Sequence, residues 1–173
     1  MDKTAANAEW NLAQINVGRM VAPRGDARVA PFFDALDRIN ALADRSPGFI
    51  WRLQTESGNA TDVQTTADPL FLVNLSLWAD AESLFEFVYR SAHTPEMARR
   101  REYFERFDGA YQALWWVSAG HIPTVDEGLS RLWRLDRYGP THEAFTFKAR
   151  FPAPGQGTQP TDMQPDPWCL GRA

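Results

Sequence analysis

His93 is the residue of this sequence with the most chemistry to offer. It lies at an expected break in a helix, just before Thr94-Pro95, which is typical of an N-cap followed by proline at the first helical position. A histidine can act as a general base, a hydrogen-bond donor or a metal ligand near neutral pH. We therefore take His93 as the candidate catalytic residue. The alternative is that it only caps or packs against the helix.

Polar side chains alternate along three expected strands and share one side of each strand. A few converging polar groups inside an apolar cavity fix the orientation of a small polar or aromatic ligand. The alternative is that these side chains face solvent or an interface, as one face of an antiparallel sheet often does. The candidate substrate-binding residues from this pattern are Asn16, Arg52, Asn74, Ser76 and Trp78, and Gln14 and Gln54 share their side.

Three consecutive arginines, Arg99 to Arg101, add a candidate anion-binding group. Adjacent helical residues point around most of the helix circumference, so one of the three must point inward, and Arg100 is the candidate to bind a carboxylate or phosphate. Arg100 and Arg101 also form i,i+4 pairs with Glu96 and Glu105, which is typical of a solvated, ion-paired helix face. Both interpretations stay open.

Trp116 and His121 complete the candidate binding residues. Trp116 follows Trp115 on an expected strand, so the two indoles must point to opposite faces of the sheet. His121 follows the same strand in a loop, where the preferred interpretation is a hydrogen bond to backbone that fixes the loop. His142 lies in a turn and is expected to be solvated.

Several function classes are excluded by missing patterns. The sequence has no catalytic-triad order, P-loop, GxGxxG, HExxH, CxxC or EF-hand pattern, which argues against the common hydrolase, nucleotide and zinc sites. A single cysteine, Cys169, excludes an internal disulfide framework and a multi-thiolate metal site. We therefore predict no metal site.

Composition indicates one globular domain with an excess of aromatic residues. The 173 residues suit a single domain, and 11 Phe, 7 Trp and 4 Tyr exceed the needs of a minimal core, which indicates a large interface, an apolar pocket or both. A net charge of −4 argues against nucleic acid as a partner. No apolar run approaches the length of a signal peptide or membrane span, so we predict a cytoplasmic protein with no membrane partner.

Periodicity and turn signals predict strands over residues 10–17, 49–54, 70–78, 111–118 and 143–151. Helices are expected over residues 29–42, from Asp80 to a break near His93, over residues 97–107, and from the capping box Thr124 to Glu127 as far as Tyr138. This order predicts an α+β fold with an antiparallel sheet: a ferredoxin-like split βαβ with an appended α-β unit. Residues 1–9 form a predicted flexible N-terminus, 10–151 the domain, and 152–173 a predicted disordered tail.

Helices of such a fold cover one face of the sheet and leave the other bare. With Trp115 and Trp116 on opposite faces, the bare face would expose a large apolar surface. A second copy of the chain is the expected cover, which predicts a homodimer.

Stretches of these elements resemble the domain-of-unknown-function family 3291 over about residues 10 to 150. They are Leu12–Asn16, Ile39–Ala43, Ser46–Gln54, Asn74–Trp78, Phe87–His93, Leu114–Val117, Gly120–Thr124 and Gly139–Thr141. That family looks like a branch of the dimeric α/β-barrel superfamily, whose members include antibiotic biosynthesis monooxygenases, haem-degrading monooxygenases and chlorite dismutases.

The resemblance implies a pocket between sheet and helices, with Asn16, Trp78 and His93 near one another. The series Trp78, Glu82, Ser91 and His93 is similar to a segment of the cofactor-independent monooxygenases. The leading hypothesis is thus a monooxygenase-like or cofactor-independent tailoring enzyme acting on a small aromatic or apolar molecule, with no cofactor expected. The alternatives are a haem-binding or haem-handling protein and a non-catalytic dimeric ligand-binding module.

Overall fold

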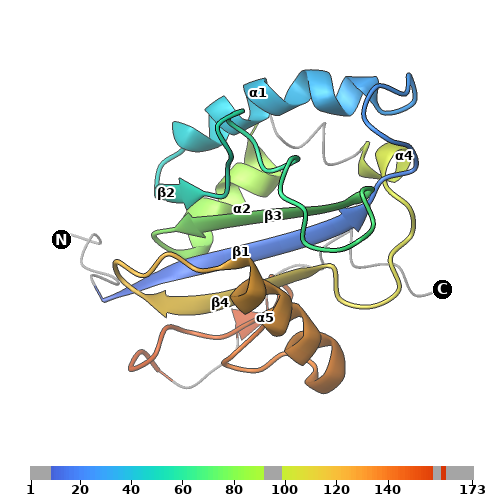
Figure 1. The fold of residues 1–173 in the computed structure, drawn as a ribbon. Helices are drawn as coiled ribbons and strands as arrows, with labels where there is room; N and C mark the ends of the chain where they lie inside the picture. Colours follow the sequence, from blue (N-terminus) through green and yellow to red (C-terminus); the bar gives the residue numbers. More distant parts are fainter. Residues whose placement is uncertain (1–8, 92–98, 158–160, 163–173) are drawn as a thin grey trace.

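The computed structural model describes residues 9–91, 99–157 and 161–162 of the chain (Figure 1). The strands are β1 (Trp10–Arg19), β2 (Phe49–Arg52), β3 (Phe71–Trp78), β4 (Gln112–Ser118), β5 (Ala149–Arg150) and β6 (Thr161–Asp162). The helices are α1 (Ala30–Asp44), α2 (Ala81–Arg90), α4 (Arg100–Tyr103) and α5 (Val125–Tyr138). None of the described helices has the length and apolar composition needed to cross a membrane.

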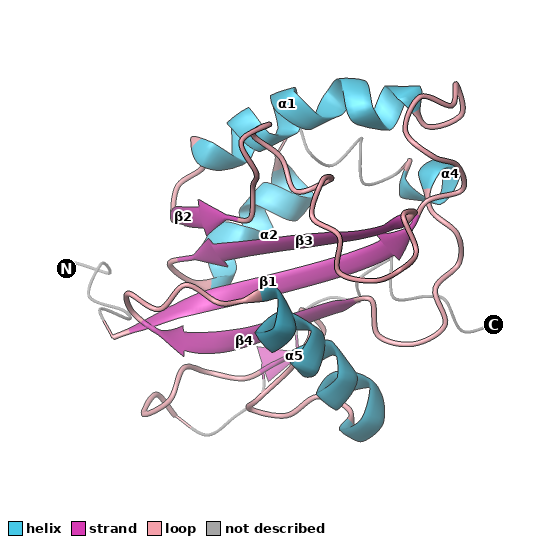
Figure 2. Ribbon diagram, in the orientation of Figure 1, coloured by secondary structure: helices cyan, strands magenta, loops and turns pink. Residues whose placement is uncertain are grey.

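In the described part of the chain, four strands form the main sheet, in the order β2-β3-β1-β4, and each neighbouring pair is antiparallel (Figure 2). The sequence of elements β1, α1, β2, β3, α2, β4 with this strand order is the ferredoxin-like arrangement. The predicted α+β fold class is therefore confirmed.

Register between the strands fixes which side chains share a face. On β4, Trp116 lies opposite Leu12 and Trp115 lies opposite Ala13, so the two indoles point to different faces as predicted. We call the face of Leu12 and Trp116 the α1 face, and the face of Ala13 and Trp115 the α5 face, after the helices that cover them.

Two helices cover the α1 face. Helix α2 begins at Asp80, whose side chain accepts a hydrogen bond of 2.7 Å from the Ser83 amide, and it buries Leu84 and Val88 against the sheet. Helix α1 has Pro in its first turn and an apolar stripe, but among its residues only Ala43 is buried. The large side chains of that stripe are therefore only half-buried, which indicates a hollow between α1 and the sheet.

Helix α5 covers the opposite face (Figure 1). It begins at Thr124, whose hydroxyl accepts a hydrogen bond of 3.1 Å from the Glu127 amide, so the predicted capping box does open this helix. Leu132 and Leu135 are buried against β1, β3 and β4. The expectation that helices leave one face bare is thus wrong, because the apolar stripe of the appended helix packs onto the sheet of its own chain.

The segments after α2 and α5 depart from the predicted elements. The described part of the predicted helix 97–107 contains α4 only, and from Phe104 the chain runs extended beside the end of β1, bonded through the amide of Glu105 to the carbonyl of Arg19 at 2.8 Å. Of the predicted strand 143–151, only Ala149–Arg150 is a strand, and Phe145 forms an isolated bridge to Leu114. Its alternating phenylalanines are buried in the core without a continuous ladder.

Within the predicted disordered tail, residues 161–162 form β6, which pairs antiparallel with β5. Both strands are two residues long. The predicted break in the helix near His93 falls outside the described residues.

Candidate functional site

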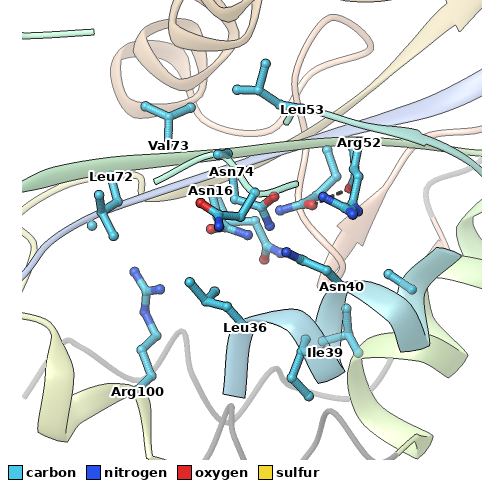
Figure 3. A pocket seen from close by; sticks show the side chains of 18 of the residues that line it. Asn16, Leu36, Ile39, Asn40, Arg52, Leu53, Leu72, Val73, Asn74 and Arg100 are labelled. Atoms are coloured by element: carbon cyan, nitrogen blue, oxygen red, sulfur yellow. Dashed lines mark hydrogen bonds between the residues drawn. The ribbon is translucent and has the colours of Figure 1, made fainter. Parts of the chain in front are cut away.

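A cavity of about 200 Å³ lies between the α1 face of the sheet and helix α1 (Figure 3). Side chains of β1, β2 and β3 form its floor, α1 forms its roof, and α2 and α4 contribute its walls. Asn74 shows how hollow this region is, because it lies in the middle of β3, beneath the helices, and is nevertheless exposed.

The floor consists of polar side chains that the strand register brings together. Gln14 lies directly opposite Ser76, Asn16 lies opposite Asn74, and Arg52 lies on the other side of Ser76. Five residues predicted from strand alternation therefore line one cavity, together with Gln14: Asn16, Arg52, Asn74, Ser76 and Trp78. Their role in binding remains a prediction.

A buried hydrogen-bond chain fixes part of this floor. The Ser76 hydroxyl donates to Gln14 Oε1 at 2.9 Å and accepts from Trp78 Nε1 at 3.0 Å. All three residues are buried. These two buried hydrogen bonds hold Trp78 and Gln14 in one orientation at the cavity floor.

Three lining amides were not singled out by the sequence, and one of them, Asn59, lies in the loop between β2 and β3. Asn40 points from α1 toward the sheet (Figure 3), and Gln112 lies opposite Asn16 at the start of β4. A polar residue inside the apolar stripe of α1, between Ile39 and Ala43, was the available signal for Asn40. The register of β4 with β1 was the signal for Gln112, and a single sequence does not supply it.

The roof and one wall are apolar. Leu36 of α1 points toward the polar floor (Figure 3), Ile39 of the same helix also lines the cavity, and α2 contributes Phe87. The ring of Phe87 stacks on Trp78 with centroids 5.1 Å apart, and Phe49 meets the same indole edge-on at 5.3 Å. The cavity thus has an aromatic end beside a polar floor, which suits a flat apolar molecule with polar substituents.

Arg52 is a neutralised cation. Its guanidinium donates to both carboxylate oxygens of Asp44, at 2.8 and 3.2 Å, and to the Gly58 carbonyl at 2.7 Å. Its side chain is 11% exposed. Arg52 therefore closes one end of the cavity with its charge already paired.

Arg100 lines the cavity from α4, away from Arg52 (Figure 3). Its Nη2 donates to the Val17 carbonyl at 2.8 Å, and its guanidinium lies 4.7 Å from the ring centre of Phe104 and 5.0 Å from that of Tyr111. Burial lowers the pKa of Arg100, against a smaller raising effect of Tyr111, yet an arginine side chain stays protonated in proteins. Glu96, predicted to pair with Arg100, lies outside the described residues.

Of the other three predicted site residues, Trp116 and His121 do not join this group. His93 lies outside the described residues. Trp116 packs on the α1 face but does not line the cavity, and its Nε1 donates to the Phe151 carbonyl at 2.8 Å. His121 is exposed beside α5, with its Nε2 2.8 Å from Glu127 Oε2. It contacts a carboxylate of the helix, whereas the preferred interpretation expected a hydrogen bond to backbone.

The described lining contains no carboxylate and no histidine. Among the residues that the structure describes, no group of His, Cys, Asp and Glu side chains could hold a metal ion. Haem iron requires an axial ligand, usually His, Cys or Met and sometimes Tyr. Of these ligand types, the described lining contains only tyrosine, at Tyr89, Tyr103 and Tyr111. This donor set does not fit haem well, and we derive no step through it.

A family model described as a domain of unknown function (DUF3291) matches residues 11–161. No curated protein matches the chain. Among solved structures, SnoaB, a cofactor-independent oxygenase from Streptomyces nogalater, is 15% identical with a TM-score of 0.41, covering 66% of this chain and 96% of SnoaB. NE2512, a protein of unknown function from Nitrosomonas europaea, is 14% identical with a TM-score of 0.43, covering 66% of this chain and 96% of NE2512.

Proposed function

We propose that this chain, which belongs to the DUF3291 family, is a small-molecule tailoring enzyme that binds an aromatic or apolar substrate between its sheet and α1. The observation that carries the proposal is the division of the cavity lining into a polar floor and an apolar roof. Apolar walls supply affinity and a few fixed polar groups supply orientation. The substrate class follows from that division.

The size of the cavity limits the substrate to a small ring system. An engineered apolar cavity of about 150 Å³ in another protein binds benzene. A cavity of about 200 Å³ therefore suits a compound of one ring or two small rings. The Trp78, Phe49 and Phe87 cluster gives such a ring an aromatic surface to pack against.

The lining favours chemistry through an anion of the substrate. Amide groups of Asn16, Asn74 and Asn40 face the cavity, and neutral donors held in place stabilise negative charge that develops on a substrate oxygen. The described lining offers no carboxylate and no imidazole, which are the groups that most often act as general bases. His93 stays the predicted base.

Oxygenation without a cofactor is the reaction that we propose for such an anion. A C–H bond of a methylene beside an aromatic ring and a carbonyl breaks, the proton goes to the base, and the carbanion is oxidised by O2. A C–O bond forms to give a hydroperoxide, which loses water. Overall, the CH2 group and O2 are converted to C=O and H2O, with O2 as the oxidant.

Filling the cavity tests the proposal. Leu36 points into the cavity and its neighbour Asp37 is exposed, so Leu36→Trp blocks the space while Asp37→Trp adds the same side chain outside it. We expect wild type and Asp37→Trp to bind 2-indanone, trans-cinnamamide or trans-cinnamate, with shifts of the Trp78 indole signal in NMR spectra. We expect Leu36→Trp to lose binding. Absence of binding of all three probes to wild type would contradict the proposed function.

Measurement of oxygen uptake distinguishes catalysis from binding alone. 2-Indanone carries an acidic benzylic methylene, and we expect the protein to accelerate its conversion to 1,2-indanedione above the spontaneous rate, with O2 consumed in equal amount. His93→Ala should abolish the acceleration while leaving probe binding intact. Binding of 2-indanone without O2 uptake would instead favour the non-catalytic ligand-binding module. A homodimer and a cytoplasmic location remain predictions of the sequence.

A further inference from the structure

Two arginines lie at the cavity, and their electrostatic surroundings differ. Arg52 is paired with Asp44 through two hydrogen bonds. Arg100 forms no ion pair with any described residue, and the Val17 carbonyl is the one hydrogen-bond acceptor that it contacts among them. A guanidinium has five N–H donors. Most of the donors of Arg100 are therefore without a protein acceptor in the described part of the chain.

Such a cation is costly to bury. Removing a charge from water without a counter-charge is unfavourable, and stacking on aromatic rings offsets only a small part of this. Phe104 and Tyr111 stack on Arg100 and hold its plane, but neither carries a negative charge at neutral pH. The arrangement is that of a positioned, charged donor facing a cavity.

The backbone around Arg100 is shaped to admit its side chain. Gly18 lies on β1 next to the guanidinium, and a Cβ there would come within 3.1 Å of Arg100 Nη2 and 2.6 Å of Phe104 Cδ1. Glycine thus leaves the space in which Arg100 and Phe104 lie against the strand. Any larger residue at this position would displace one of them.

We propose that Arg100 binds a carboxylate of the substrate, so that the substrate class is that of small aromatic or apolar carboxylic acids. The inference rests on the proposed function, since it concerns the same cavity. A planar guanidinium binds a carboxylate through two parallel hydrogen bonds, which fixes both distance and orientation.

The position of Arg100 determines how the substrate lies. Arg100 approaches β1 at Gly18, whose neighbour across the sheet on β3 is Leu72. The neighbour of Arg52 on β3 is Ser76. Four residues along β3 correspond to about 13 Å. A carboxylate at Arg100 therefore places the ring over Asn16 and Asn74, where the amide groups face the reacting part of the molecule.

The arginine run supplies its own controls. Arg99 is exposed and pairs with Glu102 at 3.0 Å, and Arg101 is exposed as well. Both carry the same charge as Arg100 without lining the cavity, Arg101 on the same short helix and Arg99 at its N-cap. Arg99→Gln and Arg101→Gln therefore change the net charge as much as Arg100→Gln does, but leave the cavity intact.

The test compares trans-cinnamate with trans-cinnamamide, which has nearly the same shape and no charge, by isothermal titration calorimetry. A hydrogen bond to a charged group contributes about 1.5–3 kcal/mol, so we expect wild type to bind the acid roughly 10- to 100-fold more tightly than the amide. Arg100→Gln should weaken acid binding much more than amide binding and so remove this preference, whereas Arg99→Gln and Arg101→Gln should keep it. Arg100→Lys should keep part of it, because the charge stays and the paired geometry is lost.

The outcomes separate this inference from the proposed function. If wild type binds the amide as tightly as the acid, or if Arg100→Gln keeps the preference, the carboxylate assignment is overturned while the cavity remains a binding site. If wild type binds neither probe nor 2-indanone, the proposed function itself fails. If Arg100→Gln does not fold, the ratio of trans-cinnamate affinity to trans-cinnamamide affinity is compared between wild type and Arg100→Lys. An equal ratio in these two proteins would overturn paired binding of the carboxylate by Arg100.

Discussion

Ser76 joins two other buried residues at the cavity floor. Its hydroxyl donates to Gln14 and accepts from the Trp78 indole. Ser76→Ala leaves a buried donor and a buried acceptor without a partner, and we expect it to lower the free energy of unfolding by about 1–3 kcal/mol in urea titrations. Ser57→Ala, at an exposed turn, is the control and should change it little. Equal stability of Ser76→Ala and wild type would mean that this hydrogen-bond chain does not hold the floor.

Substitution of Gly18 adds a side chain next to Arg100 at the cavity floor. A Cβ at Gly18 would contact Phe104 and Arg100, so we expect Gly18→Ala to cost about 1–3 kcal/mol of stability and to weaken trans-cinnamate binding more than trans-cinnamamide binding. Gly128→Ala is the matched control, because its Cβ would meet Ile15 Cδ1 at 2.6 Å on the α5 face. It should lower stability without changing the ratio of the two affinities. An unchanged ratio in Gly18→Ala would contradict the placement of Arg100.

Strand alternation predicted which polar residues share a face, because successive side chains of a strand point to opposite sides. Asn16, Asn74 and Ser76 were found on this basis alone. Facing partners such as Gln112 depend on register, and Asn40 depends on how α1 is rotated above the sheet. The local pattern fixes neither quantity, so Gln112 was missed, and the one local signal for Asn40, its place inside the apolar stripe of α1, was not used.

At the scale of elements, Glu127 links the start of α5 to the sheet. Its carboxylate accepts hydrogen bonds from Trp115 Nε1 at 2.9 Å and lies 2.8 Å from His121 Nε2. Burial raises the pKa of Glu127. The hydrogen bonds from His121 and Trp115 and the charges of His121 and Arg131 lower this pKa by more than burial raises it. The pKa of Glu127 therefore lies below its ordinary value of 4.5. The ionised form is the one that stabilises the helix start.

The sign of the pH dependence follows from that direction. A carboxylate with a lowered pKa contributes stability that is complete above its unfolded-state pKa and is lost as the pH falls through its folded-state pKa. We expect Glu127→Gln to be less stable than wild type above about pH 4.5 and the difference to shrink below it, in urea titrations across pH. The exposed neighbour Asp126 provides the control Asp126→Asn, which removes a carboxylate from the same turn and leaves the contacts with Trp115 and His121 in place. A difference independent of pH would contradict the role of Glu127.

Helices with a cap at the start were predicted closely, whereas the last strand was not. Thr124 and Asp80 each carry a side-chain acceptor that fixes the first turn, and both helices begin one residue after them. Phe145 and Phe147 alternate like strand residues, but their alternation reflects burial in the core. A period of two shows which side chains are buried, and it does not show whether the backbone has a partner strand.

At the scale of the whole molecule, both faces of the sheet are covered within one chain. The buried α5 face was the reason for expecting a second copy, and Leu132 and Leu135 now occupy it. Exposed apolar side chains remain on the outer side of α5, where Trp133 is 55% and Tyr138 61% exposed. A homodimer, if formed, therefore requires an interface other than the bare sheet.

Sedimentation equilibrium over a range of concentrations tests the homodimer that the sequence predicts. We expect wild type to sediment as a dimer, and Trp133→Ser with Tyr138→Ser to shift it toward monomer, because large exposed aromatics are enriched at interfaces. Arg106→Ser, at an exposed position outside α5, is the control. A monomer at all concentrations would refute the prediction, and a dimer unaffected by the α5 substitutions would locate its interface elsewhere.

The half-buried apolar stripe of α1 makes the thermal stability of this protein a measure of what it binds. A helix whose large apolar side chains are only half-buried contributes less than its composition allows, and a molecule held beneath it supplies the missing contacts. A ligand at a free concentration of 100 times its Kd stabilises the folded state by about 2.7 kcal/mol. Fractions of a cell extract can therefore be ranked by the melting temperature that they give the wild-type protein, with Leu36→Trp as the reference that should not respond.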